Sequence, residues 1–401
     1  MRFNRQLSRR SIFSTARFGD FKQGVFQDLK KKVFIITGEV SGDKHASGVA
    51  RELMLLNPDV EIEAVGGENL RKAGVKLFHN HDKMGAVGLS PSVIFNHFRL
   101  GLKIVNYLKN VFKPDIVLLV DYGAFNLSIS KHLKRAGIKT FYFIPPQIWA
   151  SRKWRLRTVK KNVDKVLTIF PFEGEMYDKE GIDNVYVGHP LVKELPPPAD
   201  KAEFFKRHGF DPDKKLISIF PGSRAFEIKF LFKIFEKAAK IIGKTRNDVQ
   251  FAVSHACNLP DNAFKTDLKT IKGENHALLS ASDALILASG TVALEAALYK
   301  TPMIISYRGP LFFYMVYLIV RSIKKACLVN IITGKDIVPE FLMFDAKAEK
   351  IANKIIDILD NEKEKMLQLT GFEETERLLS KKHCVKEAAK IINEELIKKE
   401  G

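Results

Sequence analysis

Apolar runs of strand length alternate with amphipathic stretches of helical length from Val33 onward, and this alternation constrains the fold more than any other feature of the sequence. The pattern is typical of α/β proteins with parallel sheets. Helices are expected between the strands, among them the stretch after Ser47 and the one that starts at Leu127. The expected strands cover residues 33–37, 61–66, 115–120, 139–144, 165–170, 184–188, 216–220, 249–254, 284–288 and 302–307.

Three consecutive prolines at residues 196–198 interrupt the alternation, which restarts beyond them. Proline fits neither a helix interior nor a central strand, so these residues mark a linker. A chain of 401 residues has room for two domains, each with its own core. The organisation that we expect is a basic extension over 1–32, a first domain over 33–195, a linker over 196–213, a second domain over 214–375 and a C-terminal helix over 376–401. The last helix carries an apolar face made of Val385, Ala388, Ala389, Ile392 and Leu396.

The composition narrows the class of protein and the compartment. With 46% hydrophobic residues the chain is not disordered, and it has no uncharged apolar run of 18 residues that could span a bilayer. The formal net charge of +19 indicates an anionic partner, which could be nucleic acid, an anionic membrane or a phosphorylated substrate. Seven of these charges come from residues 1–32, where a flexible extension is favoured over an organelle transit peptide. Three cysteines far apart disfavour a disulfide framework or a zinc site and indicate a reducing compartment.

Ligands of open parallel sheets bind beyond the carboxyl ends of the strands, so the residues that follow each strand are candidates for a site. After the first strand, Gly42 allows close backbone approach, and Ser41 or Asp43 is placed to cap the next helix. Asp121 directly follows the third strand, where an apolar wall would raise its pKa toward that of a general base. The structural alternatives are an ordinary capped turn for the first loop and a helix cap or loop anchor for Asp121.

Two junctions in the second half suit an anion. Residues 222–224, which are Gly222, Ser223 and Arg224, precede a long helix that is expected to begin near Glu227, and free N–H groups there would bind a diphosphate. Ser289, Gly290 and Thr291 stand before another helix, and Glu295 lies one turn into it. A phosphate at the helix start and a carboxylate on two vicinal hydroxyls would hold a nucleoside diphosphate at both ends. A proline turn with a surface arginine, and a solvated glutamate near the helix dipole, are the alternatives. Neither loop matches a P-loop or a dinucleotide fingerprint.

A short apolar segment suggests contact with a membrane. Residues 311–320 are ten consecutive apolar or aromatic residues, beginning with Leu311, Phe312, Phe313 and Tyr314, and cations follow at once. The segment is too short to span a bilayer and long enough to dip into its interface, although a buried core helix is equally compatible. The two tryptophans, Trp149 and Trp154, accompany a second basic cluster, which suits a membrane interface or stacking on nucleic acid bases.

A series of motifs spread along the chain resembles the lipid-A-disaccharide synthase family, from about Val33 to the C-terminus. These motifs are ITGEVSGDKHA, GGENLRKAGV, MGAVGL, VDYGAFN, PPQIWASRKWR, FPFEGEMY, VGHPL, FPGSRAFEI, ASGTVALEAAL, TPMIISYR and VPEFLM. The resemblance implies the GT-B fold, with two Rossmann-like parallel-sheet domains that face a central cleft, the first for the acceptor and the second for the UDP-sugar. Ala124 stands where the family usually has a second aspartate, and Cys327-Leu328-Val329-Asn330 stands for its SLPN.

The resemblance implies an inverting transfer that needs no metal and no cofactor. A 2,3-diacylglucosamine unit would pass from UDP to the 6-hydroxyl of 2,3-diacylglucosamine 1-phosphate, giving a β-1,6-linked disaccharide phosphate and UDP. Asp121 would be the base. The implied UDP site consists of Gly222, Ser223, Arg224, Ser289, Gly290, Thr291, Glu295 and Asn330, and the implied acceptor side of the cleft consists of Ser41, Gly42, Asp43 and Asn126.

Acylated substrates imply a cytoplasmic enzyme that sits peripherally on the inner face of the bacterial inner membrane, with Leu311, Phe312, Phe313 and Tyr314 as its contact. An organellar location is the alternative if the N-terminus is a transit peptide. Another UDP-sugar enzyme of the same architecture, such as a UDP-N-acetylglucosamine epimerase or a polyprenyl-linked sugar transferase, is the alternative activity. A nucleic-acid partner is not expected, because the net charge alone favours it.

Overall fold

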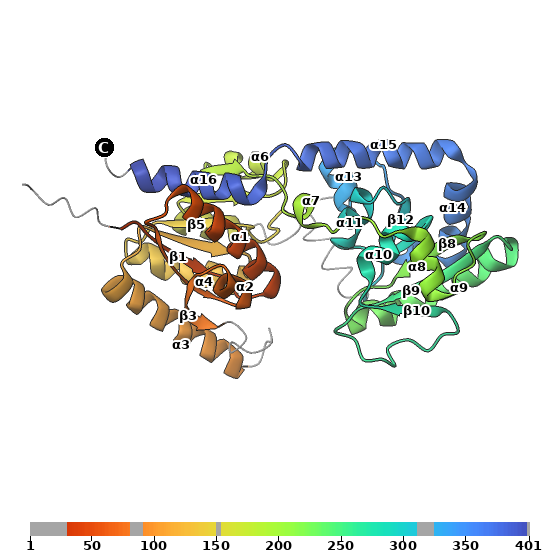
Figure 1. Ribbon diagram of the computed structural model, residues 1–401, viewed down its shortest axis with the longest axis horizontal. Helices are drawn as coiled ribbons and strands as arrows, with labels where there is room; N and C mark the ends of the chain where they lie inside the picture. The colour runs from red at the N-terminus through yellow and green to blue at the C-terminus, as the bar shows by residue number, and fades with distance from the viewer. Residues whose placement is uncertain (1–29, 81–90, 150–153, 311–324, 399–401) are drawn as a thin grey trace, which may run out of the picture. The chain divides into compact units, whose positions relative to one another are not determined.

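The fold is taken from a computed structural model, which describes residues 30–80, 91–149, 154–310 and 325–398. Two parallel sheets organise these residues, and together they confirm the α/β fold that the alternation predicts (Figure 1). The central strands β4 (Ile116–Val120) and β11 (Ala284–Ala288) consist of apolar residues that are all buried, because helices cover both faces of each sheet there.

The first sheet has seven strands in the order β3-β2-β1-β4-β5-β6-β7, and each strand runs parallel to its neighbours. Val33 and Ile35 of β1 point into one core and Phe34 and Ile36 into the other, so successive side chains serve opposite faces. The strands are β1 (Lys32–Ile36), β2 (Glu61–Gly66), β3 (Lys76–Asn80), β4 (Ile116–Val120), β5 (Thr140–Phe143), β6 (Lys165–Thr168) and β7 (Asn184–Tyr186).

Helices alternate with these strands along the chain, as parallel connections require. They are α1 (Val40–Leu56), α2 (Glu68–Lys72), α3 (Pro91–Tyr107) with its π-helical continuation η2 (Leu108–Phe112), α4 (Gly123–Arg135), α5 (Trp154–Asn162), α6 (Glu173–Lys179) and α7 (Leu191–Glu194). The chain then passes through the three prolines into α8 (Lys201–His208), whose Phe204 and Phe205 are buried. The predicted linker over 196–213 therefore contains a packed helix.

The second sheet has six strands in the order β10-β9-β8-β11-β12-β13, again with parallel pairs. Its strands are β8 (Lys215–Phe220), β9 (Val249–His255), β10 (Lys269–Lys272), β11 (Ala284–Ala288), β12 (Met303–Tyr307) and β13 (Glu340–Leu342). The helices are α9 (Ala225–Thr245), α10 (Asn275–Ala281), α11 (Val292–Leu298), α13 (Leu328–Thr333), the 3-10 turn η3 (Met343–Asp345), α14 (Ala348–Asp360), α15 (Glu362–Leu379) and α16 (Cys384–Ile397).

The last helix returns to the first sheet. α16 packs against α1, and Figure 1 draws the two helices, the first red and the last blue, against each other. Ala388, Ala389, Ile392 and Leu396 are fully buried in this contact, as their helical spacing predicts. A Cβ on Gly48 of α1 would lie 3.0 Å from Val385, so the glycine permits the close approach. The C-terminal helix thus ties the end of the chain to the beginning of the first fold unit.

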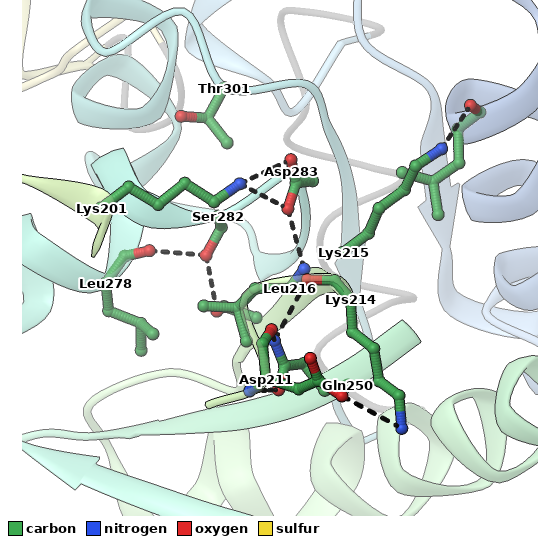
Figure 2. Close-up of polar contacts among 12 residues, drawn as sticks. Lys201, Asp211, Lys214, Lys215, Leu216, Gln250, Leu278, Ser282, Asp283 and Thr301 are labelled. Carbon is green, nitrogen blue, oxygen red and sulfur yellow. Dashed lines mark hydrogen bonds and ion pairs between the residues drawn. The ribbon is translucent and has the colours of Figure 1, made fainter. Parts of the chain in front are cut away.

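A polar network anchors the amino-terminal edge of the second sheet (Figure 2). The Asp283 carboxylate accepts hydrogen bonds from the N–H of Leu216 and from Lys201 of α8, each at 2.8 Å. Ser282 donates to the Leu278 carbonyl at 2.6 Å. These bonds fix α8 to the start of β8, while the opposite, carboxyl-terminal edge of the sheet carries the candidate site.

All ten predicted strands are present, within one or two residues at their ends. The sequence pattern did not predict β3, β10 and β13, which all belong to the outer part of a sheet. The first helix begins at Val40, seven residues before the predicted position at Ser47. None of the described helices is long and apolar enough to cross a membrane. The apolar segment 311–320 lies outside the described residues.

Candidate functional site

The strand order reverses at two places, between β1 and β4 and between β8 and β11. Connections leave such a pair of strands in opposite directions, which opens a crevice at their carboxyl ends. The predicted site residues follow these four strands. Residues 37–43, which include the first turn of α1, and Asp121 follow β1 and β4, whereas the loops at 222–224 and 289–291 follow β8 and β11.

Asp121 is held in place by its own backbone. Its φ of 49° and the φ of 50° at Tyr122 put two consecutive non-glycine residues in the left-handed region. The Asp121 carbonyl accepts hydrogen bonds from Asn126 Nδ2 and from the Tyr142 hydroxyl, each at 2.8 Å. Left-handed backbone costs about 1 to 3 kcal/mol per residue and persists only where surrounding contacts enforce it. Asn126, predicted for the acceptor side, therefore positions Asp121 through the main chain.

The surroundings of the Asp121 carboxyl favour its protonated form. Burial raises its pKa, and the Tyr122 N–H and the nearby His45 oppose this rise in part. A Cβ on Gly42 would lie 3.5 Å from the Asp121 Cβ and 2.4 Å from Thr37 Oγ1, so only glycine fits there. The close approach of α1 is what removes water from one side of this carboxyl.

Glu39 is a second carboxyl in this region, and the sequence reasoning did not single it out. Burial raises its pKa, the charge of Asp121 raises it further, and the charge of Arg224 lowers it. The pKa of Glu39 thus depends on the charges of both Asp121 and Arg224. The signal of Glu39 in the sequence was its place after β1, between Gly38 and Gly42 and directly before α1.

A cavity of about 490 Å³ brings together six of the residues predicted for the anion site, namely Gly222, Ser223, Arg224, Ser289, Gly290 and Thr291. Other described residues on its wall include Gln147 and Trp149 from the loop after β5, Ser254 and Asn275, and Lys325 and Ala326. The side chain of Ser289 donates to the Ala326 carbonyl at 3.1 Å, which joins the loop after β11 to the segment that begins at Lys325. Glu295 and Asn330 do not line this cavity.

The first of the two predicted anion loops is not free to bind phosphate through its N–H groups. Glu227 Oε2 accepts from the N–H of Ser223 at 3.0 Å and of Arg224 at 3.2 Å, and Oε1 accepts from Arg224 Nη1 at 3.1 Å. This corrects the expectation from sequence, because a glutamate in the first turn of α9 occupies the donors itself. What remains for an anion is the exposed Arg224 guanidinium, which is attached to a single carboxylate.

The second anion loop keeps its donors. No hydrogen bond joins the N–H of Gly290 or of Thr291 to another described residue, whereas the N–H of Ser289 donates to the Ser306 carbonyl at 3.0 Å. A Cβ on Gly290 would meet nothing within 4 Å, so the backbone is open to the cavity there. Of the two predicted anion loops, this one at the start of α11 is the one that keeps N–H groups available, and its role as a phosphate site stays a prediction.

Glu295 lies just inside α11, behind this loop. Burial alone raises its pKa to about 7, because no described cation is close enough to offset the lost hydration. The imidazole of His276 lies close by, with Nδ1 3.7 Å from Glu295 Oε2, and burial lowers its pKa, which favours the neutral ring. A half-buried carboxyl without a firm partner is suited to accept hydrogen bonds from a ligand.

The sequence matches one protein family over nearly its whole length. The family model described as lipid-A-disaccharide synthetase matches residues 33–393. The chain is also 36% identical over 339 residues to the lipid-A-disaccharide synthase of Coxiella burnetii (strain Dugway 5J108-111), a match that covers 82% of this chain and 89% of that one. The chain belongs to the lipid-A-disaccharide synthase family. This membership confirms the resemblance read from the motifs and makes the chain a glycosyltransferase that forms the lipid A disaccharide.

Solved structures agree on the fold. The UDP-GlcNAc 2-epimerase of Neisseria meningitidis bound to UDP-GlcNAc superimposes with a TM-score of 0.59 over 92% of this chain and 100% of that one, at 14% identity. The glycotransferase of kitacinnamycin superimposes with a TM-score of 0.62 over 92% of this chain and 99% of that one, at 10% identity. The fold is therefore GT-B, as the resemblance implied. Because the fold is common to epimerases and transferases, the family match and not the fold decides the class.

Two residues that the lipid-A-disaccharide synthase resemblance assigned to ligands are engaged within the protein. Asp43, predicted on the acceptor side, is buried and accepts from the N–H groups of Gly67 at 2.6 Å and Asn69 at 2.8 Å. It therefore caps the start of α2 and not its own helix. Ser41, in the first turn of α1, is exposed.

Asn330, predicted at the UDP site, is buried with all of its side-chain capacity engaged. Its Nδ2 donates to the Val338 carbonyl and to Glu340 Oε1, each at 2.8 Å, and its Oδ1 accepts from the N–H groups of Ile337 and Val338. Glu340 in turn accepts from the N–H of Ala326 at 2.7 Å. Asn330 thus acts on the cavity through Glu340 and Ala326, which corrects the expectation of direct contact.

The remaining expectations concern metal ions and the membrane. Within the described ranges no three His, Cys, Asp or Glu side chains gather as metal ligands would. Leu311, Phe312, Phe313 and Tyr314 lie outside the described residues, so the predicted membrane contact stays a prediction.

Proposed function

We propose that the chain transfers a 2,3-diacylglucosamine unit from UDP to the 6-hydroxyl of 2,3-diacylglucosamine 1-phosphate with inversion at the anomeric carbon. The family membership supports a lipid A disaccharide-forming transferase with UDP-sugar and lipid acceptor substrates. The finer statement about the substrates and stereochemistry rests on the arrangement of Asp121 and the cavity at the carboxyl ends of β4, β8 and β11.

In this proposal the UDP-sugar donor binds in the cavity. The open N–H groups of Gly290 and Thr291 and the Arg224 guanidinium receive the diphosphate in the cavity. The Glu295 carboxylate, which lies behind this loop and outside the cavity wall, accepts the two ribose hydroxyls where the donor extends beyond it. These groups stabilise the negative charge that grows on UDP as its bond to the sugar breaks. No residue of the site needs to hold a metal ion for this step.

Asp121 serves as the base for the acceptor. Its carboxylate removes the proton of the 6-hydroxyl as the oxygen attacks the anomeric carbon from the face opposite UDP, so the new carbon–oxygen bond forms while the old one breaks and the proton stays on Asp121. A pKa raised by burial moves the carboxyl toward the range that a general base needs. The observation that carries the proposal is this carboxyl, fixed by Asn126 and Tyr142 at the switch point between β1 and β4.

An incubation of the purified protein with UDP-2,3-diacylglucosamine and 2,3-diacylglucosamine 1-phosphate tests the proposal. We expect mass spectrometry to detect the disaccharide 1-phosphate and an equal amount of UDP, and we expect neither product when the acceptor is omitted. A parallel incubation with UDP-GlcNAc alone tests the epimerase alternative, which is the activity of the fold neighbour from Neisseria meningitidis. Epimerised sugar in that arm, without disaccharide in the first, would replace the proposal by the alternative.

A peripheral contact with an anionic membrane completes the proposal, because both substrates carry acyl chains. Besides the predicted segment 311–320, α3 offers an apolar surface that the sequence reasoning missed. Phe95, Phe98 and Leu102 are 59%, 53% and 45% exposed and share one helix face. Residues 91–113 contain Arg99, Lys103, Lys109 and Lys113 and no acidic residue. An apolar face with cations and no carboxylates is suited to an anionic lipid surface.

A further inference from the structure

The loop after β5 carries two cavity residues on an unfavourable backbone. Ile144 has a φ of 55°, a left-handed conformation that β-branched residues rarely adopt, and two prolines follow it. Gln147 and Trp149 of this loop line the donor cavity. Pro146 lies against Gly123, where a Cβ would approach it to 2.9 Å, so the loop also touches the start of α4, two residues after Asp121. Contacts with the rest of the protein must stabilise this strained loop.

Glu173, the first residue of α6, provides such an anchor. Its Oε1 accepts from the Trp149 indole Nε1 at 3.1 Å, and its Oε2 accepts from the N–H groups of Ile169 at 3.2 Å and Phe170 at 3.1 Å. The side chain is 1% exposed and the Trp149 side chain 7% exposed. One buried carboxyl therefore joins the loop after β5 to the loop after β6.

Two phenylalanine rings and the hydrogen bond to Glu173 together restrict the orientation of the Trp149 indole. Phe170 and Phe172 meet Trp149 edge to face, with ring centroids at 6.1 Å and 5.1 Å. Packing alone leaves a ring free to slide in its plane, whereas the hydrogen bond from Nε1 sets its rotation. Trp149 is thus a rigid wall of the cavity whose orientation depends on one acceptor.

We propose that Glu173 is a positioning residue of the donor site, which acts by holding the Trp149 indole as a wall of the cavity that binds UDP. This inference rests on the proposed function for the identity of the donor and assigns a role to a carboxyl that the reaction itself does not use. Glu173 touches neither substrate; it acts through the indole. Loss of its acceptor oxygen leaves the indole N–H unpaired in a buried position and frees the ring to turn.

The titration of Glu173 can be followed at the indole N–H of Trp149. Burial raises its pKa to about 7, against the pull of its three hydrogen bonds. The Trp149 indole N–H is therefore bound to a group that titrates near neutrality. Trp149 and Trp154 are the two tryptophans of the chain, so a Trp154→Phe variant leaves one indole to observe.

The test combines indole NMR with titration of UDP in the Trp154→Phe protein. We expect the single indole N–H signal to shift with pH around a midpoint near 7 and to respond to UDP. Glu173→Gln retains size but has one acceptor oxygen for these donors. With that oxygen on the N–H groups of Ile169 and Phe170, its NH2 faces the indole N–H, so the variant should remove the pH dependence and weaken UDP binding about tenfold. Trp149→Phe, which keeps an aromatic ring and removes the N–H, should weaken UDP binding in the same direction, and it serves if Glu173→Gln does not fold.

Glu63→Gln is the matched control. Glu63 is also buried, 3% exposed, and accepts from Lys76 and Tyr107, but it lies on β2 away from the cavity. Its change should lower stability and leave the UDP affinity and the indole signal unaltered. UDP bound as tightly by Glu173→Gln and Trp149→Phe as by the parent would overturn the inference. Failure of the wild type to form disaccharide, with the indole and UDP effects intact, would instead reject only the proposed reaction.

Discussion

At the scale of single residues, the site depends on groups held by unfavourable backbone or by burial. Asp121 and Tyr122 together represent about 2 to 6 kcal/mol of left-handed backbone, which the hydrogen bonds to the Asp121 carbonyl and the surrounding core offset. The result is a main chain that holds Asp121 at the end of β4. Glu295 differs, since its backbone is an ordinary helix and only burial alters its chemistry.

Glu295 predicts a pH dependence of UDP binding. A carboxylate that accepts two hydroxyls must be ionised, and the free protein holds its pKa at about 7. The UDP affinity should therefore rise as pH increases through 7 and fall up to about tenfold per pH unit below it. Calorimetric titration between pH 5.5 and 8.5 measures this. Glu295→Gln is the control, because it removes the group and should flatten the part of the profile due to the protein; equal slopes for both proteins would contradict the ribose role.

The positions of Asp121, Arg224 and the loop at 289–291 could be predicted from the sequence, because parallel strands bring their carboxyl ends to one edge. The partners of Asp43 and Asn330 could not. Asp43 bonds to N–H groups 24 and 26 residues away, and no local pattern marks such a long-range cap. Glu173 was missed for the same reason, since its partner Trp149 comes from another loop.

At the scale of elements, strand prediction mostly followed the number of buried apolar residues; β7 is the exception, because it has no fully buried residue and was still predicted. β1 and β4 are buried over four or five successive residues and were found. β10 buries only Ile271 of its four residues, and β3 and β13 have none that is fully buried. Strands in the outer part of a sheet need fewer apolar side chains, so the periodic signal disappears there.

The packing of α16 on α1 gives a stability prediction. Ile392 is fully buried between the two helices, so Ile392→Ala should lower the free energy of unfolding by about 2 to 4 kcal/mol through lost apolar contact and the cavity left behind. Urea denaturation followed by circular dichroism measures it. Ile397→Ala in the same helix is the control, because that side chain is 53% exposed, and it should change stability by less than about 0.5 kcal/mol. Equal effects of the two changes would mean that α16 is not docked as described.

At the scale of the whole molecule, the net charge of +19 fits the proposed contact with an anionic lipid surface and phosphorylated substrates. Residues 1–32 contribute seven of these charges, and the acid-free stretch 91–113 contributes four more beside an apolar face. Cations placed next to exposed apolar side chains indicate an interface where both kinds of contact act at once.

The triple variant Phe95→Ser, Phe98→Ser and Leu102→Ser should bind vesicles that contain phosphatidylglycerol at least about tenfold more weakly, because each apolar side chain that enters the interface contributes on the order of 1 kcal/mol. Cosedimentation with the vesicles measures the bound fraction. The control is Leu55→Ser with Leu56→Ser, two exposed leucines of α1, which should leave binding unchanged. A triple variant that sediments like the wild type would assign membrane contact to another surface, such as residues 311–320.

The proposed transfer reaction depends most directly on Asp121. The most direct measurement is the single-turnover rate of disaccharide formation by the wild type and by Asp121→Asn, with both substrates saturating and the UDP affinity of each protein determined in parallel. Asparagine keeps the shape and cannot accept the proton, so the account predicts a rate about 100- to 10,000-fold lower with UDP bound as tightly as before. A variant that forms the disaccharide at the wild-type rate would contradict it.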